Sequence, residues 1–206
     1  MKEITITSVV KEGGKDVRIL ILLSTGNLDD KIQRELEQSI KKYKGILVGN
    51  QCHIVDDYHQ LSEAVSKYKG QFDILCFFAH GDNDHRIFFS NDKYSDKSDM
   101  SFDEAQVAWV LEDVLNDKIG IFASCYIGTE NMFDCLTNYP SMALCAICVK
   151  PNVRIPYTDA VQFVTKFVEK MQELKHLNIN TSHIKEVVFP YANSAVKEQF
   201  ELKCAV

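Results

Sequence analysis

The sequence predicts an α/β fold, a three-layer sandwich in which about six mostly parallel strands form a sheet with helices on both faces. Three observations predict it. Short apolar runs alternate along the chain with segments of helical periodicity. Several runs are apolar at nearly every position, as in strands buried on both faces of a parallel sheet. No composition shift or long linker divides the 206 residues, so we expect a single domain over residues 1–206.

The amino-terminal third begins with two strand-like runs. Residues 4–10 alternate between apolar and polar side chains, and residues 17–23 are almost continuously apolar. The turn between them contains two glycines, so this pair can form a hairpin at one end of the sheet. Residues 29–43 and 58–68 have apolar side chains at helical spacing, with short strand-like runs between 46 and 55.

The rest of the chain continues this alternation. Ser101 and Glu104 are spaced as a capping box, which predicts where one helix begins. The predicted elements are strands at 73–79 and 86–90, a helix from 101 to about 115, strands at 118–123 and 143–149, an amphipathic helix at 158–174, and a last short strand at 187–189 before a polar tail.

Composition excludes several classes of protein. A net charge of −6 without a basic stripe argues against nucleic acid or an anionic membrane as partner. No apolar run approaches the roughly 20 residues that span a bilayer, and the amino terminus does not resemble a secretory signal, so we expect a cytoplasmic protein. In that compartment the seven cysteines should be reduced thiols. Cys145 and Cys148 lie in an apolar run and are interpreted as buried strand residues, not as a zinc or redox pair.

Two of the predicted strands are followed directly by reactive residues. The strand at 73–79 leads into His80-Gly81, and the strand at 118–123 leads into Ser124-Cys125. Functional groups collect at the carboxyl ends of parallel strands, and adjacent strands lie about 5 Å apart, so His80 and Cys125 can face one crevice. A positioned histidine can activate a thiol. The backbone N–H groups of Gly81 and Cys125 are the candidate donors to a developing oxyanion.

These motifs resemble a known family. FFAHGD at 77–82 and IFASCYIG at 121–128 resemble the His-Gly and Cys motifs of caspase-like (clan CD) cysteine peptidases, among them caspases, metacaspases, separases and prokaryotic CHAT-type proteases. The histidine and cysteine are 45 residues apart, against roughly 50 in caspases. The resemblance covers about residues 17–174 and looks closer to the compact prokaryotic CHAT-type proteins. One departure is that Gly128 follows Cys125 by three residues, where the caspase signature has two.

The resemblance implies a cysteine endopeptidase that acts on a protein or peptide. Cys125 would be the nucleophile, and His80 the general base and then the general acid. The catalytic core would span residues 17–175, between an amino-terminal strand and turn at 1–16 and a carboxyl-terminal strand and tail at 176–206. The alternative from another class is a catalytically silent caspase-like module that acts as a scaffold or interaction partner.

A cytosolic endopeptidase without control would damage its host, so we expect its activity to be gated. Since the catalytic fold is expected to use nearly the whole chain, we expect control from a regulatory protein partner, an ion, self-association or cleavage within the polar loop 91–101. In prokaryotic relatives such control belongs to defence, including antiviral defence, or regulated cell death. No cofactor is expected, although metacaspase-like members can need calcium. The acidic cluster is more simply interpreted as a solvated loop, and its members are Asp82, Asp84, Asp92, Asp96 and Asp99.

Four charged residues are weaker candidates for a substrate pocket. Asp82 and Asp84 follow His80, whereas Lys150 and Arg154 follow the strand at 143–149. Relatives divide between cleavage after Asp and cleavage after Arg or Lys, and the resemblance together with the net charge of −6 favours a basic or uncharged P1 residue. His85 competes with His80 for the role of base and is interpreted as a hairpin residue.

Overall fold

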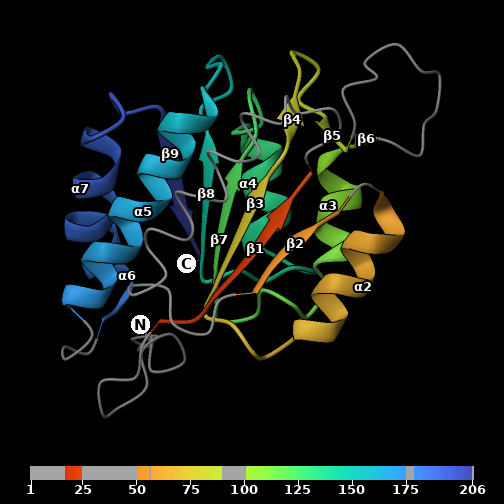
Figure 1. The fold of residues 1–206 in the computed structure, drawn as a ribbon, viewed down its shortest axis with the longest axis horizontal. Coiled ribbons are helices and arrows are strands. Elements are labelled where there is room, and N and C mark those ends of the chain that lie inside the picture. Colours follow the sequence, from red (N-terminus) through yellow and green to blue (C-terminus); the bar gives the residue numbers. More distant parts are fainter. Residues whose placement is uncertain (1–16, 25–50, 56, 90–100, 175–178, 206) are drawn as a thin grey trace.

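The structure is a computed structural model that describes residues 17–24, 51–55, 57–89, 101–174 and 179–205 (Figure 1). Its centre is a six-stranded sheet in the order β2-β1-β3-β7-β8-β9. The first five strands in that order are parallel to their neighbours, and β9 pairs antiparallel with β8 at the edge. The strands are β1 (Ile19–Leu23), β2 (Gln51–Ile54), β3 (Ile74–Phe78), β7 (Ile119–Ala123), β8 (Cys145–Val149) and β9 (Phe200–Cys204). This confirms the α/β fold class predicted from the sequence.

Helices cover both faces of the sheet, so the molecule has three layers (Figure 1). One face carries α2 (Tyr58–Tyr68), α3 (Glu104–Val110) and α4 (Glu130–Thr137). The other face carries α5 (Tyr157–Glu173), the short α6 (Thr181–His183), the π-helix η2 (Ile184–Val188) and α7 (Phe189–Ser194). A second, three-stranded sheet stands past the carboxyl end of β3, formed by β4 (His80–Gly81), β5 (Ile87–Phe88) and β6 (Ser101–Phe102).

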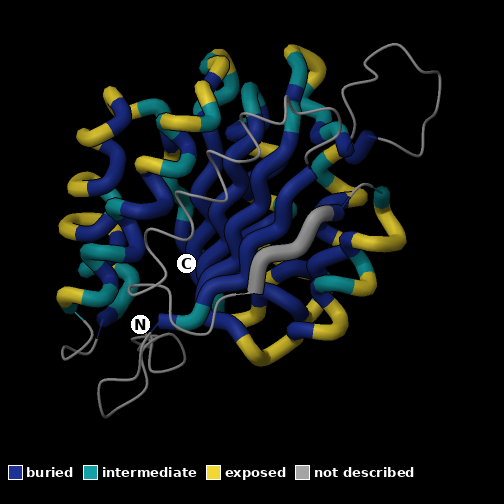
Figure 2. Tube along the Cα trace, in the orientation of Figure 1, coloured by how far each residue is buried: buried dark blue, intermediate teal, exposed yellow. Residues whose placement is uncertain are grey.

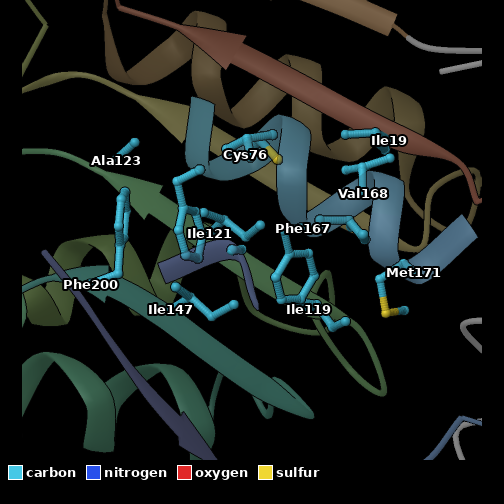
Figure 3. Close-up of a cluster of buried hydrophobic side chains, with 14 of the residues drawn as sticks. Ile19, Cys76, Ile119, Ile121, Ala123, Ile147, Phe167, Val168, Met171 and Phe200 are labelled. Carbon is cyan, nitrogen blue, oxygen red and sulfur yellow. The ribbon is translucent and has the colours of Figure 1, made fainter. Parts of the chain in front are cut away.

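The strands are buried on both sides, as their continuously apolar sequences predict. Figure 2 shows the described inner strands buried along their length, with exposure concentrated on the outer helices and turns. Successive side chains alternate between two cores. In β3, Cys76 and Phe78 face α5, whereas Leu75 and Phe77 face α2 and α3. Figure 3 shows Phe167 of α5 packed over the side chains of the sheet.

The amino ends of β1 and β3 are joined by an ion pair. The guanidinium of Arg18 donates to both carboxylate oxygens of Asp73, at 2.7 and 3.1 Å, and the backbone N–H of Arg18 donates to the same carboxylate at 2.9 Å. Asp73 is buried, and its carboxylate raises the pKa of Arg18. The pair aligns the amino ends of two central strands, whereas the cysteine and histidine motifs lie at the carboxyl ends.

One predicted helix start is wrong by two residues. Ser101 lies in β6, and the capping box of α3 is formed by Asp103 and Gln106 instead. Asp103 accepts from the backbone of Gln106 at 2.9 Å, and Gln106 returns a bond to the backbone of Asp103 at 3.0 Å. The spacing of three residues recurs two positions later, and pairing of β6 with β5 draws Ser101 into a strand.

The predicted carboxyl-terminal strand and tail are also corrected. The expected strand at 187–189 is helical, because Ile184, Val188 and Ala192 recur every four residues and pack toward α5. The expected polar tail contains strand β9, with Phe200 and Cys204 buried.

Cys204 forms a disulfide with Cys145 across β8 and β9, so the expectation of reduced thiols is wrong for these two cysteines. Cys148 stays a thiol on the other face of β8, which agrees with the interpretation of the Cys145-Cys148 spacing as buried strand residues. The predicted strand at 4–10, helix at 29–43 and loop residues 91–100 lie outside the described residues. No described helix has the length and apolar character needed to cross a membrane.

Candidate active site

The strand register brings the two predicted catalytic segments to the same height. Phe78 of β3 is the direct neighbour of Ala123 of β7 in the parallel pairing. Both side chains face α5. His80, in β4, and Cys125, in the loop after β7, each come two residues past these positions. Cys125 packs against the α5-side core, and the His80 ring contacts Tyr157 of α5.

Gly81 shows how closely the two segments approach. A Cβ built on Gly81 would lie 2.0 Å from the carbonyl oxygen of Cys125 and 2.7 Å from the Oγ of Ser124. The first obstacle is backbone, which cannot rotate away. Glycine is therefore required here because the His80-Gly81 corner lies directly against the Ser124-Cys125 corner.

The thiol of Cys125 lies at a half-exposed position beside the start of α5. Its Sγ is 3.8 Å from the carbonyl oxygen of Ile155, which can accept from the thiol. The next residue, Tyr126, has φ +66°, and its backbone N–H donates to Val153 at 3.1 Å. The cysteine corner is thus held by the loop that connects β8 to α5.

The position of Gly128, three residues after Cys125 and not two as in the caspase signature, is explained by a contact with β8. The N–H of Gly128 donates to the carbonyl oxygen of Val149 at 2.7 Å, and a Cβ on Gly128 would lie 2.4 Å from that oxygen. The glycine permits the loop after Cys125 to pack against the end of β8. Its place in the sequence is set by this contact with the neighbouring strand.

The turn after Gly81 uses Asp82 internally. The Oδ1 of Asp82 accepts from the backbone N–H groups of Asp84, at 3.0 Å, and Arg86, at 3.2 Å. His85 has φ +61°, and its Nδ1 lies 2.5 Å from the carbonyl oxygen of Tyr126. Since a carbonyl only accepts, Nδ1 carries the proton. His85 therefore connects the hairpin to the cysteine loop, as the interpretation of it as a hairpin residue requires.

The four candidate pocket residues lie on two loops. Asp84 is exposed in the hairpin turn, near Asp82. Lys150 is half-buried and Arg154 exposed in the β8–α5 loop, the loop that contacts Cys125 and Tyr126. The two pairs thus lie on the two loops that contact the cysteine corner, and the described part of the chain shows no ion pair between them.

Three hydroxyl residues of this region were not singled out from the sequence. Ser24 follows β1 and donates to the carbonyl oxygen of Phe89 at 2.5 Å, so it holds the small sheet onto the large one. Ser124 is buried between Cys125 and Gly81. Tyr157 opens α5 and stands edge-on to His80, with ring centroids 5.8 Å apart at 84°. A tyrosine directly after Pro156, at the start of a strongly amphipathic helix, was the only sequence signal for it.

The remaining thiols occupy different environments. Cys76 and Cys148 are fully buried, and burial raises the pKa of each. Cys135 of α4 is half-buried, and its pKa is raised by burial and by nearby carboxylates. Within the described residues, no group of three or more His, Cys, Asp or Glu side chains is arranged to hold a metal ion.

Comparisons with known proteins give structural likeness but no match in sequence. No family model matches the sequence, and no curated protein matches it. Among solved structures, the chain is similar to a chain of the Saccharomyces cerevisiae separase–securin complex, with a TM-score of 0.49 and 10% sequence identity. The match covers 93% of this chain and 12% of that chain. A likeness this low assigns no function, which has to be argued from the site.

Proposed function

We propose that this protein is a cysteine endopeptidase with a caspase-like His/Cys dyad. The observation that carries the proposal is the contact between two corners at the carboxyl ends of neighbouring strands. One corner holds His80 and Gly81, and the other holds Cys125. A thiol, an imidazole and backbone donors from two strand ends make up the set that acyl transfer by a thiol requires.

The proposed reaction divides peptide hydrolysis into two steps. His80 takes the proton of the Cys125 thiol, and the sulfur attacks the scissile carbonyl carbon. The N–H groups of Gly81 and Cys125 stabilise the resulting oxyanion. His80 then gives the proton to the leaving amine, which produces a thioester on Cys125. A water molecule, deprotonated by His80, hydrolyses the thioester and restores the thiol.

The proposed substrate is a protein or peptide with a basic or uncharged P1 residue. The acidic side chains near the hairpin and the net charge of −6 support this preference. Asp84 is better suited than Asp82 to meet a substrate cation, because the Asp82 carboxylate accepts from two backbone N–H groups. Lys150 and Arg154 would border the other side of the same site.

The proposed biological role follows from the family resemblance of the motifs. We assign the chain to a single caspase-like domain that works as a gated effector in a prokaryotic defence or regulated-cell-death system. A regulatory protein partner would supply the gate. The preference for a protein gate over calcium is supported by the internal use of Asp82 in its turn.

A catalytically silent caspase-like module is the second candidate. It is favoured by the loop after Cys125, where Tyr126 has a positive φ and its N–H is taken by Val153. A scaffold could keep this loop shape without needing access to the thiol. The two candidates differ in one measurable property, the reactivity of Cys125 toward a peptide electrophile.

The test is labelling with biotinylated peptidyl acyloxymethyl ketones that carry Lys, Leu or Asp at P1, with and without calcium. We expect selective labelling of Cys125, fastest for Lys or Leu, and its loss in Cys125→Ala. Cys135→Ala is the matched control, because Cys135 is also a half-exposed thiol but is carried on a helix. Labelling that is independent of the peptide and equal at both cysteines would refute the peptidase and favour the silent module.

A further inference from the structure

Tyr157 has an unusual position for a tyrosine. Its hydroxyl oxygen is buried and makes no hydrogen bond to any residue of the described chain. Buried tyrosine hydroxyls ordinarily find a partner, because leaving one unpaired costs free energy. The phenol is the first residue of α5, held there by Pro156 at the N-cap. An unpaired hydroxyl on a rigid helix indicates a group kept for a ligand.

The surroundings of the phenol are the catalytic groups themselves. Its ring meets the His80 ring edge-on, at 5.8 Å between centroids. Cys125 lies near enough that a charge on its sulfur raises the pKa of Tyr157, after burial, which is the larger cause. Tyr157 therefore stays protonated over the pH range in which a thiol–imidazole dyad works, and a neutral phenol can donate one hydrogen bond.

Within the described residues, the Tyr157 hydroxyl has no hydrogen-bond acceptor. The carbonyl of Ile155, two residues before Tyr157, lies against the Cys125 sulfur instead. A substrate carbonyl under attack by that sulfur would bring an oxygen into this region and would gain negative charge there. A pre-positioned donor in a water-poor site stabilises such a charge without reorganising.

We propose that Tyr157 is a catalytic residue whose hydroxyl donates a hydrogen bond to the oxyanion formed when Cys125 attacks the substrate. The proposal rests on the peptidase function proposed above. The phenol gives up no proton in any step. It adds a side-chain donor to the backbone N–H groups of Gly81 and Cys125.

The experiment compares Tyr157→Phe with the wild-type chain under identical assay conditions, with and without calcium. Phenylalanine keeps the ring against His80 and removes only the hydroxyl. On a fluorogenic peptide, we expect kcat to fall by about 100-fold with KM within roughly twofold, as for loss of one oxyanion-hole donor. Binding of a peptide aldehyde, which forms an oxyanion on the cysteine, should weaken by a similar factor.

Alkylation of Cys125 by iodoacetamide separates this role from positioning of His80. Alkylation forms no oxyanion, so its rate and pH profile should be the same in Tyr157→Phe and wild type. Tyr58→Phe is the matched control, because Tyr58 also opens a helix but is exposed on the opposite face of the sheet. It should change none of these measurements.

Each contrary outcome has a distinct meaning. If the wild type is active and Tyr157→Phe has the same kcat, only the proposed role of Tyr157 is overturned. A shifted alkylation pH profile shows that Tyr157 acts through His80 and also overturns the proposal. A wild-type chain that cleaves no peptide and binds no aldehyde overturns the peptidase function, and the role of Tyr157 with it.

A second variant covers the case in which Tyr157→Phe does not fold. Replacement of Tyr157 by 3,5-difluorotyrosine keeps the ring and the donor but makes the phenol more acidic. The alkaline limb of kcat should then move to lower pH, because the ionised phenol cannot donate. An unchanged alkaline limb overturns the proposal.

Discussion

Cysteines in the middle of the sheet and a cysteine just past the carboxyl ends of its strands lie in opposite environments. Cys76 and Cys148 lie within β3 and β8, fully buried, and burial raises the pKa of both thiols. Cys125 lies two residues past β7, half-exposed beside a histidine motif. The difference teaches that position along a strand separates a cysteine that fills the core from one that can react.

The amino and carboxyl ends of the strands, here called the amino and carboxyl edges of the sheet, also differ in how their buried polar groups are paired. At the amino edge, the Asp73 carboxylate is buried but satisfied by the side chain and backbone of Arg18. At the carboxyl edge, the hydroxyls of Ser124 and Tyr157 are buried without a hydrogen bond in the described part of the chain. One edge uses its polar groups to align strands, whereas the other keeps them available.

The largest expected effect comes from exchanging the two kinds of cysteine for alanine. Cys125→Ala should lower turnover by 10³-fold or more, because the nucleophile is lost, and leave the melting temperature nearly unchanged. Cys148→Ala should keep the kcat of the folded molecules but reduce the free energy of unfolding by about 1–2 kcal/mol, because it opens a cavity in the core. Peptide turnover and thermal unfolding of both variants test the contrast. Full activity in Cys125→Ala would refute the site.

Gly81→Ala should break the contact between the two corners. Its Cβ would collide with the backbone of Cys125, so we expect a loss of about 3 kcal/mol in stability and a loss of Cys125 labelling even under conditions where the protein is folded. Gly70→Ala is the matched control, because Gly70 has φ +77° and open space around it. It should cost about 1 kcal/mol through backbone strain and leave labelling intact. Equal labelling in both variants would show that the corners tolerate separation.

Alkaline pH should reduce the free energy of unfolding because of the two buried thiols. The thiols of Cys76 and Cys148 have raised pKa values in the folded chain, so the folded state keeps protons that the unfolded state loses above about pH 8.5. The resulting contribution to the free energy of unfolding is fully present below about pH 8.5. It is lost as pH rises above that value, at about 1.4 kcal/mol per pH unit for each thiol.

Urea unfolding between pH 7.5 and 10 measures this slope. Cys148→Ala should have a shallower slope than the wild type, by the share of one thiol. A free energy of unfolding that stays flat across this range would contradict the burial of the two core thiols.

The smallest expected effect is that of His85, which contacts the cysteine loop through the carbonyl oxygen of Tyr126. His85→Ala removes the hydrogen bond to the carbonyl of Tyr126 and should lower kcat by roughly tenfold through misplacement of Cys125. His85→Gln can restore a donor and should recover part of the loss. His59→Ala, at an exposed position of α2, is the control. A loss in His85→Ala as large as that in His80→Ala would reassign the base.

The sequence by itself determined the buried central strands of the sheet, the helices α2, α3 and α5, and the two motifs at the strand ends. Strands buried on both faces need apolar side chains at every position, so β3, β7 and β8 could be predicted from their local sequences. Parallel pairing then follows from the helical crossovers, which predicts that His80 and Cys125 end neighbouring strands. The capping box of α3 was placed two residues too early, because the same spacing recurs in the sequence. The carboxyl-terminal helical segment was predicted as a strand, because a run of three apolar residues does not distinguish the two.

Only the tertiary structure decided what lies between the motifs. The contact of Gly81 with Cys125, the bond from Gly128 to Val149 and the ring of Tyr157 beside His80 join segments that are distant in the chain. No periodicity encodes such contacts, since they depend on the register of β3 against β7 and on where α5 begins. The pairing of Cys145 with Cys204 was hidden for the same reason, because an edge strand is recognised as a strand only when its partner is known.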